Sequence, residues 1–209
     1  MRKTLVLLSA WIAITAAPCF AASSNCPAGF IEKYGINVGA HARADGSPES
    51  TPQNGSCGAR MKKGLTLPDE RCTPGAYNPT VTPEVLRDPA FRTSCLRNQA
   101  TTAHEKAVTY DWYGVKHPAN NKGANQTCEL DHLIPLELGG ADTLDNIWPE
   151  CGPPRVTLKK RYFKEKDTVE TDLGRRVKSE SAQQAAKDLP QFRRGIAEDW
   201  TQYYRPGAN

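Results

Sequence analysis

The chain has 209 residues, with 27 Lys and Arg against 23 Asp and Glu and a formal net charge of +4. This mild charge excludes a strong attraction to DNA or RNA along the whole chain, so any contact with nucleic acid must come from a local basic patch. No period of 20 to 50 residues recurs, which excludes a repeat protein.

Residues 1–21 have the features of a secretory signal peptide. Arg2 and Lys3 form a charged start, Leu5–Ala17 is mostly apolar, and Ala21 ends a plausible cleavage site. The apolar run is too short for a membrane span, so we expect no membrane attachment after cleavage; a lipid anchor on Cys19 is the alternative. Removing residues 1–21 leaves 25 basic and 23 acidic residues, a net charge of +2. The sequence therefore predicts an exported protein, either periplasmic or secreted.

Six cysteines remain after the signal peptide, and an even number in an exported chain favours disulfides over free thiols. A structural zinc site is the rival explanation, but no Cys-x-x-Cys pair and no close Cys/His cluster is present. Six cysteines allow 15 pairings, as a matter of counting. One of them, Cys26 with Cys57, would close the N-terminal segment into a loop.

The segment 22–66 is rich in Gly, Ser, Pro and Asn and predicts a loop-rich N-terminal arm, followed by a folded domain over 67–209. Many prolines in 67–100 indicate turns and extended pieces, although Thr82 and Pro83 can open a short helix that runs to Leu86. Residues 101–114 are typical of a helix that ends at Gly114.

Residues 128–151 predict two short strands around Gly139-Gly140, and a long helix is expected after Pro154. Its apolar residues recur at three- and four-residue spacing. A second helix is expected to begin near Leu189-Pro190, with an apolar stripe that Pro206 ends. The predicted fold class is α+β with more helix than sheet. The stripe consists of Phe192, Ile196, Trp200 and Tyr203.

The register of the hairpin can be predicted from residue numbers, because facing residues of an antiparallel pair have a constant sum. His132 and Asn146 sum to 278, and Cys128 and Cys151 sum to 279. One register, within a residue, therefore places both pairs across from each other. We expect a Cys128–Cys151 disulfide, with Asn146 beside His132.

The hairpin, with Asp131-His132 on one strand, Asn146 on the other and a helix after it, resembles the ββα-metal motif of the HNH endonucleases. The phrases 131–140 and 146–150 are similar to an exported branch of HNH-like proteins, as are 72–82 and 196–205. The resemblance covers roughly Leu67 to Arg205 and leaves the N-terminal arm outside it. It implies an HNH-like domain at 67–209, in which a ββα-metal hairpin-helix core carries additional helices and a disulfide-stabilised arm.

The resemblance also implies roles for the matching residues. His132 would be the general base that takes a proton from the attacking water. Asp131 would bind one divalent metal ion, with Mg²⁺ expected and Mn²⁺ or Zn²⁺ as alternatives, and the ion would stabilise the leaving oxygen. Asn146 would hold the loop and the His132 ring in orientation through backbone hydrogen bonds.

The sequence departs from the family pattern at the second metal ligand, which should be a His or Asn early on the following helix. The expected position falls near Tyr162 by one spacing and on Arg155 by another, and neither is a good metal ligand. Carboxylates could substitute for the ligand. The candidates are Glu150, Glu165 and Asp167.

A basic run lies at the start of the same helix, where it would meet nucleic-acid phosphates or form an ordinary solvated helix face. These observations predict an exported metal-dependent endonuclease that hydrolyses phosphodiester bonds in DNA or RNA. The alternative is a disulfide-stabilised binding or structural protein that keeps the HNH scaffold without its chemistry. No feature of the sequence indicates an oligomeric state. The basic run consists of Lys159, Lys160, Arg161 and Lys164.

Overall fold

The structure is a computed structural model that describes residues 25–99, 101, 103–119, 121, 126–151 and 162–207. It combines helices with small antiparallel sheets, so the predicted α+β class is confirmed. The predicted signal peptide and the basic residues Lys159, Lys160 and Arg161 lie outside the described residues.

Three two-stranded antiparallel sheets form the β part of the described fold. Strand β1 (Ala42–Arg43) pairs with β4 (Ala76–Tyr77), and β2 (Arg60–Lys62) pairs with β3 (Leu65–Leu67). The segment 22–66 thus supplies β1, β2 and two residues of β3, and it pairs with later residues. The third sheet is the predicted hairpin, in which β5 (Cys128–His132) pairs with β6 (Ile147–Cys151).

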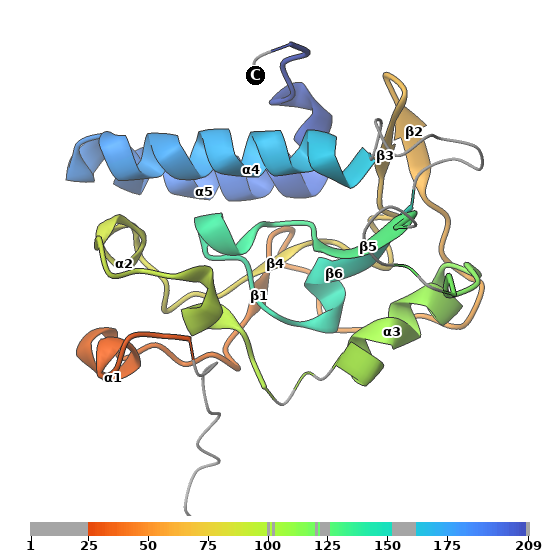
Figure 1. The fold of residues 1–209 in the computed structure, drawn as a ribbon, viewed down its shortest axis with the longest axis horizontal. Coiled ribbons are helices and arrows are strands. Elements are labelled where there is room, and N and C mark those ends of the chain that lie inside the picture. Colours follow the sequence, from red (N-terminus) through yellow and green to blue (C-terminus); the bar gives the residue numbers. More distant parts are fainter. Residues whose placement is uncertain are drawn as a thin grey trace, which may run out of the picture.

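The two long helices, α4 and α5, run side by side and form a layer over the hairpin and the smaller elements (Figure 1). Short 3-10 turns lie between α2 and α3, between the two hairpin strands and after α5. The helices are α1 (Phe30–Tyr34), α2 (Pro83–Arg87), α3 (Ala103–Trp112), α4 (Tyr162–Ser179) and α5 (Ala182–Asp199), and the 3-10 turns are η1 (Thr93–Leu96), η3 (Leu136–Leu138), η4 (Leu144–Asn146) and η5 (Trp200–Gln202).

Capping side chains explain where two helices begin. Thr82 caps α2 by accepting a hydrogen bond from the Val85 N–H, as the sequence predicted. The predicted start of α5 near Leu189 is wrong. The helix begins at Ala182, where Ser181 is the N-cap and accepts a hydrogen bond from the Gln184 N–H, and Pro190 lies inside the helix. Proline removes one helical N–H, and burial of the α5 stripe against the core offsets that cost.

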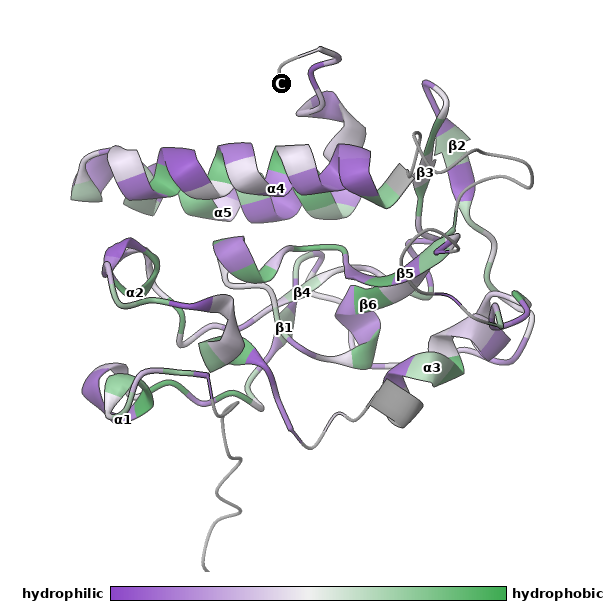
Figure 2. Ribbon diagram, in the orientation of Figure 1, coloured by the Kyte–Doolittle hydropathy of each residue, from purple (hydrophilic) through white to green (hydrophobic). Residues whose placement is uncertain are grey.

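The core lies between the α4–α5 layer and the loops beneath it. Bands of hydrophobic residues alternate with hydrophilic ones along both helices, which is the pattern of half-buried helices (Figure 2). Val169, Leu173 and Val177 of α4 are buried, and Trp148 and Trp200 are fully buried. All of these residues belong to one hydrophobic core, which α4 shares with Trp148 of the hairpin.

Three disulfides join the described segments, and they indicate an oxidising environment. The predicted Cys128–Cys151 bond is confirmed, and it closes the open end of the hairpin. The pairing of Cys26 with Cys57 is wrong, since Cys26 bonds Cys95 and Cys57 bonds Cys72. No helix in the described ranges is long and apolar enough to span a membrane.

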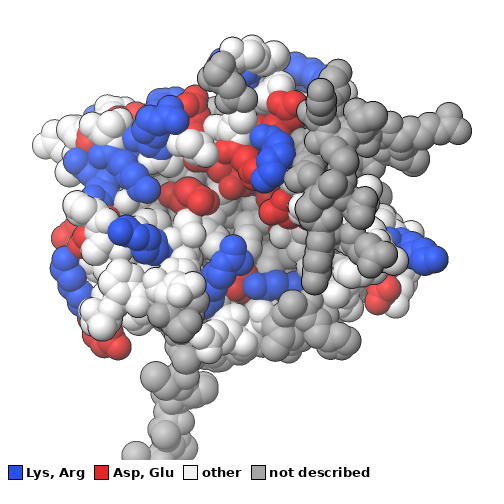
Figure 3. Space-filling model, in the orientation of Figure 1, with Lys and Arg blue, Asp and Glu red and all other residues white. Residues whose placement is uncertain are grey.

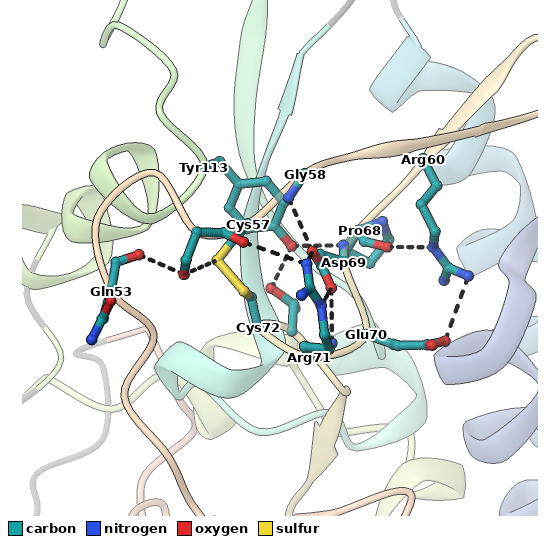
Figure 4. A network of polar contacts seen from close by, with 12 residues as sticks. Gln53, Cys57, Gly58, Arg60, Pro68, Asp69, Glu70, Arg71, Cys72 and Tyr113 are labelled. Carbon is teal, nitrogen blue, oxygen red and sulfur yellow. Dashed lines mark hydrogen bonds and ion pairs between the residues drawn. A yellow bond between two sulfur atoms is a disulfide. The ribbon is translucent and has the colours of Figure 1, made fainter.

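The Cys57–Cys72 disulfide borders a polar network centred on Asp69 (Figure 4). The Asp69 carboxylate accepts hydrogen bonds from Arg71 (2.6 Å) and from the Gly58 N–H (3.0 Å). The Tyr113 hydroxyl accepts from the Asp69 N–H, and burial raises the pKa of Tyr113 to about 12. Hydrogen bonding from Arg71 lowers the pKa of Asp69 to about 2. The network therefore ties the β2–β3 region to Tyr113, the residue that follows α3.

This network predicts a loss of stability in acid. The folded-state pKa of Asp69 lies below its ordinary value of about 4, so the ionised carboxylate adds stability above that pH. That contribution, about 1–2 kcal/mol because Arg71 is largely exposed to solvent, is lost as the pH falls from about 4 to about 2. Urea unfolding should show that Asp69→Asn is less stable than wild type at neutral pH.

The difference between Asp69→Asn and wild type should shrink as the pH falls. The exposed Asp111 of α3 offers a control, and Asp111→Asn should follow the wild-type curve at every pH. A constant difference between Asp69→Asn and wild type down to the acid limit would contradict the role given to the carboxylate charge.

Candidate active site

The candidate site lies at the end of the β5–β6 hairpin where the two strands enter the connecting loop. In the observed register, Asp131 faces Trp148 and His132 faces Ile147. Successive side chains of a strand point to opposite faces, so Asp131 and His132 look to opposite sides of the hairpin. Each therefore has its own set of neighbours.

Asn146 holds the loop between the strands from the inside. Its Oδ1 accepts hydrogen bonds from the Ile134 N–H (2.9 Å) and the Ala76 N–H (3.1 Å). Its Nδ2 donates to the carbonyl groups of Ile134 (2.9 Å) and Ala141 (2.8 Å). The side chain is fully buried and all four bonds go to backbone. Asn146 thus holds the loop, and its side-chain bonds go to these backbone groups and not to the His132 ring.

Gly140 makes the tight course of this loop possible. A Cβ atom at this position would lie 1.8 Å from the Ile134 carbonyl oxygen, which no side chain can accept. The Gly140 N–H donates to the Pro135 carbonyl (2.9 Å). The close backbone approach places Ala141 and Asp142 directly beside the end of β5.

The His132 ring is held by Asp142, with Nε2 2.7 Å from Asp142 Oδ1. Lys106 of α3 binds the same carboxylate at 2.7 Å, and the Asn98 N–H donates to its other oxygen (2.8 Å). Burial alone would raise the pKa of Asp142, but the bonds from His132 and Lys106 bring it below its ordinary value. Asp142 is therefore ionised at neutral pH.

An ionised carboxylate only accepts hydrogen bonds, so His132 Nε2 is the donor to Asp142, and the tautomer that this bond selects has its lone pair on Nδ1. The ring is 12% exposed, so water reaches part of it. A neutral imidazole with a fixed tautomer and access to water is the arrangement that a general base requires.

Lys166 of α4 faces Asp131 on the other side of the hairpin. Its Nζ lies 2.8 Å from Asp131 Oδ2, 2.6 Å from Glu170 Oε1 and 2.7 Å from the His132 carbonyl oxygen. Trp148 Nε1 also donates to Asp131 Oδ2 (3.1 Å). Burial would lower the pKa of Lys166, but the carboxylates of Asp131 and Glu170 raise it above its ordinary value. Lys166 is therefore a permanent cation.

Further carboxylates lie around this lysine. Glu150 is fully buried on β6, and neither of its oxygens has a hydrogen-bond partner among the described residues. Burial and the charge of Asp131 raise the pKa of Glu150 well above its ordinary range, and burial raises that of Glu170, while the charge of Lys166 acts in the opposite direction on both.

A divalent ion at Asp131 does not fit the side chains found there. Asp131 Oδ2 already accepts from Lys166 and Trp148, and the Lys166 ammonium brings a positive charge from α4 to within 2.8 Å of the same oxygen. Within the described ranges, no group of three or more His, Cys, Asp and Glu side chains has the arrangement of a metal site. Mg²⁺, Mn²⁺ or Zn²⁺ bound by Asp131 remains a prediction from the sequence.

The charged surface around the site is mixed. Acidic side chains gather near the centre of the face that carries α4 and the hairpin, with basic side chains around them (Figure 3). Lys164 is exposed on α4 and pairs with Asp167, while Glu165 accepts from the Tyr204 hydroxyl. The side chain of Tyr162 lies outside the described residues. Glu165 and Asp167, which were candidate metal ligands, thus have partners of their own.

Sequence reasoning missed Asp142, Lys106, Lys166 and Glu170. A signal existed for one pair, because Lys166 and Glu170 are four residues apart on a predicted helix. The hairpin register also puts Glu129 opposite Glu150 and on the same face as Asp131, and three acidic residues on one face of a covered hairpin require a cation or protons nearby. No comparable sequence pattern indicated that Asp142 would bind His132.

Comparison of the chain with protein-family models, with curated proteins and with solved structures gives no match.

Proposed function

We propose that this protein is an exported HNH-type phosphodiesterase that cleaves DNA or RNA. The observation that carries the proposal is the His132–Asp142 pair at the end of a hairpin whose loop is held by Asn146. This pair supplies an oriented base, and the hairpin with the α4 helix above it has the element order of a ββα core. Residues 1–21 and the three disulfides support export.

The reaction assigned to this site is hydrolysis. A water molecule attacks phosphorus, and His132 Nδ1 accepts a proton from it as the new P–O bond forms. The bond from phosphorus to the leaving sugar oxygen breaks, and that oxygen takes a proton from solvent. Asp142 stabilises the imidazolium that results, because its negative charge lies 2.7 Å from Nε2.

A second candidate function is a binding or structural protein that uses the same scaffold without catalysis. One observation favours it, because the Asp131 carboxylate, which the resemblance assigns to the metal ion, is bound by Lys166 at 2.8 Å. The two candidates differ in whether the purified protein breaks phosphodiester bonds.

The experiment is to incubate the mature, oxidised protein with supercoiled plasmid and with RNA, in EDTA or with Mg²⁺, Mn²⁺ or Zn²⁺. We expect nicked or shortened products, and the cleavage activity should coelute with the protein in gel filtration. The His132→Ala protein, prepared in parallel, controls for contaminating nucleases. Intact substrates under every condition would favour the scaffold function.

A further inference from the structure

Lys166 joins three structural parts through one ammonium group. It is 1% exposed, and its Nζ contacts the Asp131 carboxylate on β5, the Glu170 carboxylate one turn along α4 and the His132 carbonyl at the end of β5. An ammonium has three N–H donors, so these three acceptors at 2.6–2.8 Å use all of them. Lys166 therefore cannot also bind a phosphate directly, and its effect on chemistry runs through what it holds.

In a ββα-metal site, the metal ion would join the hairpin strand to the following helix. The resemblance implies an ion held between the residue before the catalytic histidine and a ligand on the following helix. Lys166 spans this pair of elements, since it reaches from α4 to Asp131. A cation tethered to the helix brings its positive charge to Asp131 without any need for an ion from solution.

We propose that Lys166 takes the place of the divalent ion, fastening the hairpin to α4 and positioning His132, so that the protein needs no divalent metal at Asp131. The claim that Lys166 positions His132 for cleavage rests on the proposed function. The claim that Asp131 needs no divalent ion depends on Asp131, Lys166 and Glu170 alone. Lys166 is thus a positioning residue, which acts through the His132 carbonyl and the Asp131 carboxylate.

The decisive variant is Lys166→Met, which keeps an aliphatic side chain of similar length and removes the charge. Asp131 and Glu170 then face a space without a cation, and an oxygen-seeking ion such as Mn²⁺ should enter it. Thermal unfolding is expected to show no response of the wild type to Mn²⁺ or EDTA. Saturating Mn²⁺ should raise the Tm of Lys166→Met by about 4 °C or more.

Lys62→Met is the matched control, because Lys62 also pairs with a carboxylate, that of Asp199, at 2.6 Å. This substitution leaves the half-buried Asp199 carboxylate, on whose pKa no other carboxylate of the described residues has a marked effect, so Mn²⁺ should not change its Tm. Should Lys166→Met fail to fold, titration calorimetry of Mn²⁺ into the wild-type protein replaces it, with no saturable binding expected. Saturable binding that Asp131→Asn abolishes would overturn the proposal.

Cleavage assays separate this proposal from the proposed function. Wild-type cleavage should be equal in EDTA and in Mn²⁺. Lys166→Met should lose activity about 10-fold or more in EDTA and regain part of it with Mn²⁺, a recovery that a merely structural lysine would not give.

Wild-type cleavage that requires an added metal would overturn the inference about Lys166 but leave the proposed nuclease function standing. Absence of cleavage in every condition rejects the nuclease, and the Tm response to Mn²⁺ still decides the metal question.

Discussion

His132→Ala is expected to lower the rate of phosphodiester cleavage by about 10²–10⁴-fold, the contribution of a positioned general base. The loss should fall on kcat more than on KM, because the imidazole takes its proton in the transition state. Asp142→Asn should cause a loss of similar order. An Asn amide donates to Nε2, which moves the ring proton to Nδ1 and removes the lone pair that accepts the proton of water.

Steady-state kinetics on a fluorescent oligonucleotide would measure both variants, with urea unfolding to verify that each one folds. His41→Ala is the matched control, because His41 also pairs with a carboxylate, that of Glu49 at 2.7 Å, but lies in the N-terminal segment. Its kinetics should equal those of the wild type. Full activity in His132→Ala would reject the assigned base, and full activity in Asp142→Asn would reject the tautomer argument.

Asn146→Ala is expected to destabilise the protein by about 3–5 kcal/mol. The substitution leaves the N–H groups of Ala76 and Ile134 and the carbonyl groups of Ile134 and Ala141 without their partner. Asn146 is fully buried, so water cannot replace the lost bonds without entering the core. The loop that brings Asp142 to His132 should loosen at the same time.

Asn121 provides the comparison for this effect. It also binds backbone groups of the hairpin, since it donates to the Cys128 carbonyl and accepts from the Thr127 and Cys128 N–H groups. Asn121 is half-buried, so water can take over these bonds and Asn121→Ala should cost about 1 kcal/mol. Urea unfolding at neutral pH gives both values. Equal losses in the two variants would contradict the argument that burial makes Asn146 critical.

The hairpin was predictable because its constraints are local and periodic. A constant sum of residue numbers predicted the Cys128–Cys151 pairing, which the structure contains. Thr82 and the apolar stripes of the long helices follow equally local rules. Such local rules cannot predict the Cys26–Cys95 bond, because 69 residues separate the two cysteines.

The polar part of the candidate site was less predictable. Asp142 meets His132 because Gly140 allows a tight loop, and the path of that loop is a tertiary property. Lys166 lies in a run of charged residues that is typical of a solvated helix face, yet it is buried while Lys164, two residues earlier, is exposed. The charge pattern of a helix does not tell which of its lysines turns inward; packing of α4 on the hairpin decides it.

The connectivity of the disulfides affects how the chain can be oxidised. The Cys57–Cys72 bond is nested inside the loop that Cys26–Cys95 closes, whereas Cys128–Cys151 stands apart. A chain oxidised in the order of its cysteines would join Cys26 to Cys57 and Cys72 to Cys95. Both bonds would have to be broken by thiol–disulfide exchange, so a chain oxidised in that order would need an isomerisation step in its N-terminal half. The hairpin that carries His132 needs no such exchange, because pairing in sequence order joins Cys128 directly to Cys151.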